Sequence, residues 1–69
     1  MRAFRRHVVH RRVVINLRSG TAVEGVVVSQ AGPLLVIKDA RIHEVGAEPR
    51  AADGDIVVER THVDFIQAL

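Results

Sequence analysis

Most apolar residues of this chain fall into short runs in which alternate side chains are hydrophobic, which is the period of a β-strand. The clearest run is 13–18, where Val13, Ile15 and Leu17 share one face. Ser19-Gly20 follows as a turn signal, because glycine adopts positive φ at no steric cost. Four further runs cover residues 21–29, 34 to about 43, 56–59 and 63–67. The pattern predicts five short strands and therefore an all-β protein.

The segments between these runs predict a compact barrel or sandwich. Gly25 lies inside the second run, where a glycine usually marks a bulge or a sharp bend. Residues 30–33 end that run at a proline, which cannot donate to a β-ladder. Residues 44–55 have the composition of a longer surface loop, and residues 60–62 are short enough for a tight turn. Before the first strand, the sequence leaves open whether residues 2–9 form a short helix or an extended arm.

The expected barrel interior follows from the alternation. It comprises Val13, Ile15, Leu17, Val23, Val27, Leu35, Ile37, Val57, Val63 and either Phe65 or Ile66. Three runs are apolar on both faces, at 26–28, 34–37 and 56–58, and such runs usually mean burial on both sides. Because a small barrel has one interior, we expect the outward valines to contact another protein surface.

Composition narrows the class of protein. Sixty-nine residues make one small domain, and the absence of cysteine excludes disulfides and thiolate metal sites. Valine is the commonest apolar residue, and its branched Cβ suits a strand. No apolar run approaches the roughly 20 residues that span a bilayer, so no membrane association is expected.

Positive charge is concentrated at the start of the chain. Six arginines precede the first acidic residue, Glu24, although the net charge is only +2. We therefore expect a basic N-terminal arm over residues 1–12 and a single barrel domain over 13–69. Clustered arginine can neutralise phosphates or dock on an acidic protein, and both possibilities stay open. The predicted partner- or nucleic-acid-binding residues are Arg5, Arg6, Arg11, Arg12 and Arg18.

Candidate chemistry is sparse, so no enzyme activity, cofactor or small-molecule substrate is expected. No G-x-S-x-G elbow surrounds either serine, and the adjacent Thr61 and His62 cannot easily form a nucleophile–base pair. His7 and His10 are three apart, which would place them on opposite faces of a strand. Without cysteine, a metal site would need ligands from distant segments, and none is predicted.

The spacing of apolar residues and glycines from Val13 to Asp39 resembles the first motif of Sm-like proteins. It reads Val13-x-Ile15-x-Leu17-x-x-Gly20, Val23-x-Gly25-x-Val27 and Leu35-x-Ile37-x-Asp39, and 57–66 looks like the second motif. The resemblance implies a strongly bent, five-stranded Sm/SH3-like barrel that assembles through its fourth and fifth strands. The family reads RNA with an Asp and an Asn near the turn into the third strand, but residues 30–34 contain neither. The family's Arg-Gly pair falls on Glu59-Arg60, where an acidic side chain would repel phosphate.

The chain as a whole also resembles small virion-structure proteins of actinobacterial tailed phages, with an Arg-rich start and a valine barrel. That likeness implies a component of the capsid, connector or tail, located in the virion or the host cytoplasm. The leading hypothesis is a non-enzymatic assembly module that binds copies of itself and a protein partner. The alternative is an Sm-like RNA- or DNA-binding ring that uses the basic arm.

Overall fold

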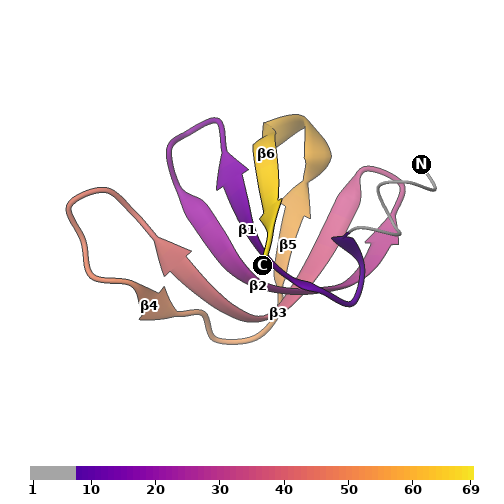
Figure 1. The fold of residues 1–69 in the computed structure, drawn as a ribbon, viewed down its shortest axis with the longest axis horizontal. Helices are drawn as coiled ribbons and strands as arrows, with labels where there is room; N and C mark the ends of the chain where they lie inside the picture. The colour runs from indigo at the N-terminus through magenta and orange to yellow at the C-terminus, as the bar shows by residue number, and fades with distance from the viewer. Residues whose placement is uncertain (1–7) are drawn as a thin grey trace.

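The computed structural model describes residues 8–69, which form one strongly curved antiparallel sheet (Figure 1). The elements are β1 (Arg12–Leu17), β2 (Ala22–Ala31), β3 (Leu34–His43), β4 (Arg50–Ala51), β5 (Ile56–Glu59), the 3₁₀ turn η1 (Arg60–His62) and β6 (Val63–Ala68). The all-β prediction and its five strands are confirmed. The two-residue strand β4 lies within the expected loop 44–55 and was not predicted.

The strands follow the order β4-β3-β2-β1-β6, and β5 pairs with β3 away from this path. β1 lies between β2 and β6, while β3 pairs with β2, β4 and β5 in turn. Figure 1 shows β2 and β3 as long arcs, which carry the sheet around the interior. η1 joins β5 directly to β6, yet these two strands are not paired with each other.

The bend that closes the sheet is centred on Gly25. The β2–β3 register shifts between Glu24 and Val26 and again between Val27 and Ser29. A Cβ at position 25 would lie 2.5 Å from Cγ2 of Ile37 and 2.8 Å from the carbonyl oxygen of Lys38. Opposite this contact, Asp39 has a φ of 51°, in the left-handed region that few non-glycine residues adopt. The bend predicted from Gly25 is therefore present, because only glycine leaves room for the two strands to approach.

The core lies inside this curve and largely matches the alternation. Six predicted residues are buried, namely Val13, Ile15, Val23, Val27, Leu35 and Ile37, and Val8, Ala40 and Val58 join them. Leu17, Val63 and Ile66 are partly buried and pack against that cluster.

One expected core residue, Val57, is instead exposed. Val57 is 57% exposed and Val58 takes its place in the interior, so the inward and outward positions of β5 are exchanged. This strand carries three successive apolar residues, and a one-residue change of register turns each side chain to the opposite face. Of the pair Phe65 and Ile66, Ile66 faces the core and Phe65 is 53% exposed.

The last residues of the expected basic arm pack on the barrel. Val8 is buried in the core, and the His10 N–H donates to the carbonyl oxygen of Val27 at 2.6 Å. The Val27 N–H in turn donates to the carbonyl oxygen of Arg11 at 3.2 Å, and Arg12 already belongs to β1. The sequence leaves open whether residues 2–9 form a helix or an extended arm, and most of these residues lie outside the described part of the chain. Within residues 8–69, no helix is long and apolar enough to cross a membrane.

Candidate functional site: open strand edges and a basic depression

Two strands of the curved sheet carry an unbonded edge. β5 is bonded to β3 on one side and β6 to β1 on one side, and no strand among residues 8–69 covers the other side of either. Backbone groups along such an edge are unpaired donors and acceptors that can bond to another chain. β4 also ends the sheet, but two residues offer little length for pairing.

Exposed apolar side chains gather on and beside these two strands. Val57 lies on β5, Phe65 lies on β6, and Leu69 directly follows β6. The other exposed large apolar residues are Leu34 at the start of β3 and Val45 in the loop after β3. The outward valines of β2, Val26 and Val28, are half-buried. The exposed apolar surface is therefore centred on the open edges rather than on β2.

The predicted basic residues do not form one patch. Arg5 and Arg6 lie outside the described residues. Arg11 donates from Nη2 to the carbonyl oxygen of Leu69 at 3.2 Å, near the beginning of β1. Arg18 follows the end of the same strand, roughly 20 Å away at 3.3 Å per residue. Arg11 and Arg12 therefore cannot share a contact with Arg18.

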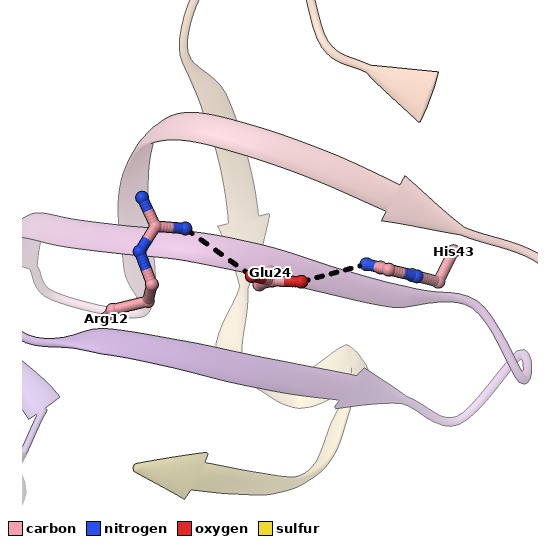
Figure 2. A network of polar contacts seen from close by, with 3 residues as sticks. All are labelled: Arg12, Glu24 and His43. Carbon is pink, nitrogen blue, oxygen red and sulfur yellow. Dashed lines mark hydrogen bonds and ion pairs between the residues drawn. The ribbon is translucent and has the colours of Figure 1, made fainter. Parts of the chain in front are cut away.

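Arg12 already has an acidic partner on the neighbouring strand. Figure 2 shows the Glu24 carboxylate between Arg12 and His43, so that the three side chains link β1, β2 and β3. Arg12 Nη1 lies 3.6 Å from Glu24 Oε2, and His43 Nε2 lies 3.1 Å from Glu24 Oε1. This pairing offsets the positive charge of Arg12, which leaves less of it for an external anion.

Arg18 lies in a different environment, where two turns meet. The Arg18 N–H donates to the carbonyl oxygen of His62 at 2.9 Å, and its Nε donates to the carbonyl oxygen of Thr61 at 3.2 Å. These bonds attach the β1–β2 turn to η1, and both segments lie at the top of the view in Figure 1. Between them is an open depression of about 280 Å³, lined by Leu17, Arg18, Ser19 and His62.

Arg18 is among the predicted binding residues, whereas its neighbours Leu17, Ser19 and His62 are not. Ser19 and His62 are 43 positions apart in the chain, and only the pairing of β1 with β6 brings them together. The sequence indicates only that a turn follows β1 at Ser19 and that another follows β5 at residues 60–62.

The 3₁₀ turn η1 also contacts the turn between β2 and β3. The Arg60 N–H donates to the carbonyl oxygen of Pro33 at 2.7 Å, which joins η1 to the β2–β3 turn. Gln30 donates from Nε2 to the carbonyl oxygen of Gly32, while its Oε1 is buried without a hydrogen-bond partner among the described residues. Glu59 is exposed beside this junction.

The described part of the chain contains no group of three His, Asp or Glu side chains that could hold a metal ion. His10 and His43 lie at opposite ends of the paired strands, and His43 is engaged with Glu24. Arg60, Thr61 and His62 follow one another in η1 with no buried residue among them.

Comparison with solved structures identifies the fold. The chain superposes on the SmAP1 heptamer of P. aerophilum with a TM-score of 0.82 and 23% identity, covering 100% of this chain and 92% of that one. The Sm protein of Pyrococcus abyssi, solved in complex with a uridine heptamer, gives a TM-score of 0.80 and 20% identity, covering 99% and 94%. A heptameric archaeal Sm protein gives 0.80 and 24% identity, covering 97% of each chain.

These similarities confirm the Sm-like barrel that the motif spacing indicated. No protein-family model and no curated protein matches the chain in sequence. The resemblance to phage virion proteins finds no support among these structures, all of which are Sm proteins.

Proposed function

We propose that this protein assembles into a ring of identical subunits that binds single-stranded RNA and catalyses no reaction. The observation that carries the proposal is the pair of unbonded edges, β5 and β6, on a barrel with the Sm fold. The ring corresponds to the second of the two functions expected from the sequence. The assembly of identical subunits is common to both.

The two edges suit a head-to-tail assembly. They lie on different strands, so β5 of one copy can pair with β6 of the next, and each copy keeps one edge free for a further neighbour. Such heterologous contacts generate closed rings when the rotation between subunits closes. Each junction would extend the sheet of one subunit into the next and cover Val57 and Phe65, which are exposed in the single chain.

RNA is favoured as the ligand by the fold neighbours and by the placement of the turns. One neighbour was solved with a uridine heptamer, and two were solved as heptamers. In this chain, η1 contacts both the β1–β2 turn and the β2–β3 turn. These three strand connections therefore lie next to one another in each subunit. Repeated around a ring, this place would offer one contact per subunit to a continuous strand.

Assembly can be tested by placing a charge on the exposed apolar residue of β5. We expect Val57→Glu to convert an oligomer into a folded 7.6 kDa monomer, because the carboxylate would be desolvated in the subunit junction. The matched control is Val45→Glu, since Val45 is 95% exposed in a loop distant from both edges. Size-exclusion chromatography with light scattering measures the mass. A wild-type monomer, or equal masses for the two variants, would refute the ring.

RNA binding can be read in the same experiment. The chain has no Trp or Tyr, so absorbance at 260 nm along the protein peak reports bound nucleic acid almost alone. We expect oligouridine to co-elute with the wild-type oligomer at low salt and to dissociate as salt rises, because phosphate contacts release counterions. An oligomer that binds neither oligouridine nor mixed-sequence single-stranded RNA would keep the ring and remove the RNA function.

A further inference from the structure

We infer that the depression between the β1–β2 turn and η1 binds the phosphate of a nucleotide, with Arg18 as its principal ligand. This inference rests on the proposed function and assigns the RNA contact to a place that lacks the family's Asp, Asn and Arg-Gly residues. It proceeds from the four lining residues, Leu17, Arg18, Ser19 and His62.

The charge of the depression favours an anion. Arg18 supplies a guanidinium, and none of the four lining residues is acidic. Among residues 8–69, the Arg18 side chain has one hydrogen-bond partner, the Thr61 carbonyl oxygen, which accepts from Nε. The terminal nitrogens therefore keep their N–H donors, and guanidinium donors match the oxygens of a phosphate. By contrast, Arg12 is paired with Glu24, and Arg50 is paired with Glu44 at 2.6 Å.

The frame around Arg18 is built before any ligand arrives. Backbone bonds fix the turn on both sides, from Leu17 N–H to the Thr21 carbonyl oxygen at 2.9 Å and from Gly20 N–H to the Leu17 carbonyl oxygen at 3.0 Å. The bonds of Arg18 to His62 and Thr61 hold η1 against that turn. Because the guanidinium is anchored through Nε, less side-chain entropy is lost when its remaining donors bind a ligand.

The size and the remaining lining suit one nucleotide. A volume of about 280 Å³ is near the lower end of ligand pockets, which are typically several hundred cubic ångströms. Leu17 provides an apolar wall, while the Ser19 hydroxyl and the His62 imidazole provide further hydrogen-bonding groups. A phosphate at Arg18 would leave the sugar or base beside these three side chains.

The test compares two arginine variants of the same charge change. Arg18→Gln removes the proposed ligand, whereas Arg41→Gln removes an exposed arginine on β3 whose side chain has no hydrogen bond or ion pair with another residue in the range 8–69. We expect Arg18→Gln to weaken oligouridine binding about tenfold, which equals about 1.4 kcal/mol, because the variant loses charged hydrogen-bond donors to the phosphate. The logarithm of the association constant should also fall less steeply with the logarithm of the salt concentration. The slope should become shallower by about 0.7 for each phosphate contact that is lost. Arg41→Gln should change affinity less than about twofold, which equals about 0.4 kcal/mol.

Amide NMR titrations show whether the phosphate of RNA or that of a free nucleotide binds in the depression. They also test the phosphate site independently of the proposed RNA function. We expect oligouridine to shift the amides of Ser19, Thr61 and His62 in wild type and not in Arg18→Gln, with uridine monophosphate giving weaker shifts and uridine none. Oligouridine binding that is equal in both arginine variants would overturn the site and leave the RNA-binding ring standing. Shifts with the monophosphate but no binding of RNA would keep the phosphate site and remove the RNA function.

Discussion

Two regions of this barrel differ in whether the chain completes the sheet by itself. We call the contact of β2 with β3 around Gly25 the bend, and the unpaired edges of β5 and β6 the seam. At the bend, the backbones approach so closely that no side chain fits between them, and Gly25, Ile37 and Ala40 are buried on its inner side. At the seam, the sheet stays open and Val57 and Phe65 remain exposed. The bend is complete within one chain, whereas the seam is complete only if another chain supplies the missing strand.

The largest effect is expected from filling the bend. Gly25→Val places side-chain atoms where a Cβ alone would lie 2.5 Å from Ile37 and 2.8 Å from the Lys38 backbone. The backbone cannot give way cheaply, so we expect a loss above about 4 kcal/mol, enough to unfold a domain of this size. Circular dichroism during urea titration measures it. The control is Ala31→Val at the exposed end of β2, which should change stability by less than about 0.5 kcal/mol. A cooperatively folded Gly25→Val protein would show that the bend is not a tight contact.

How far the sequence predicts this structure differs between the two regions. In β1, β2 and β3 the alternation identifies the buried residues, because polar residues such as Asn16 and Glu24 mark the outer face. In β5 the run Ile56-Val57-Val58 contains no polar residue to mark a face, so the sequence does not define the register. The depression at Arg18 depends on Ser19 and His62, which only the pairing of β1 with β6 brings together. No local pattern could reveal that contact.

A pair of truncations should separate the core from the seam. Leu35 is fully buried and Phe65 is 53% exposed. In the monomeric Val57→Glu background, we expect Leu35→Ala to cost about 3 kcal/mol and Phe65→Ala less than about 1 kcal/mol, since only the first leaves a cavity. Denaturant titrations at equal protein concentration measure both.

The same Phe65 truncation should cost more in the assembling protein. There, the ring we propose would bury the phenyl group against a neighbour, and stability would depend on subunit concentration. We expect Phe65→Ala to lower the denaturant midpoint of unfolding more when it is introduced into the wild-type protein than when it is introduced into Val57→Glu. An identical loss in both backgrounds would mean that Phe65 makes no subunit contact, and the seam would then be an ordinary exposed edge.

The smallest loss of stability is expected from a substitution on the outer face of the bend, where Glu24 links Arg12 to His43. All three side chains are partly exposed, at 44%, 28% and 37% for Arg12, Glu24 and His43, so solvent screens their attraction. Exposed ion pairs contribute about 0–1 kcal/mol, and we expect Glu24→Gln to cost about 0.5 kcal/mol. Glu48→Gln is the control, because that loop residue has no ion pair with any residue in the range 8–69.

The salt dependence of this small loss decides where the bend obtains its stability. If the loss is electrostatic, thermal denaturation should show it at 50 mM salt and lose it at about 1 M, where the Debye length is about 3 Å. A loss that persists at high salt, or exceeds about 2 kcal/mol, would mean that Glu24 supports the curvature of β2 directly. The bend would then depend on the polar bridge across β1, β2 and β3 as well as on the space left by Gly25. The expected result assigns it to backbone packing alone and leaves the outer face free to vary.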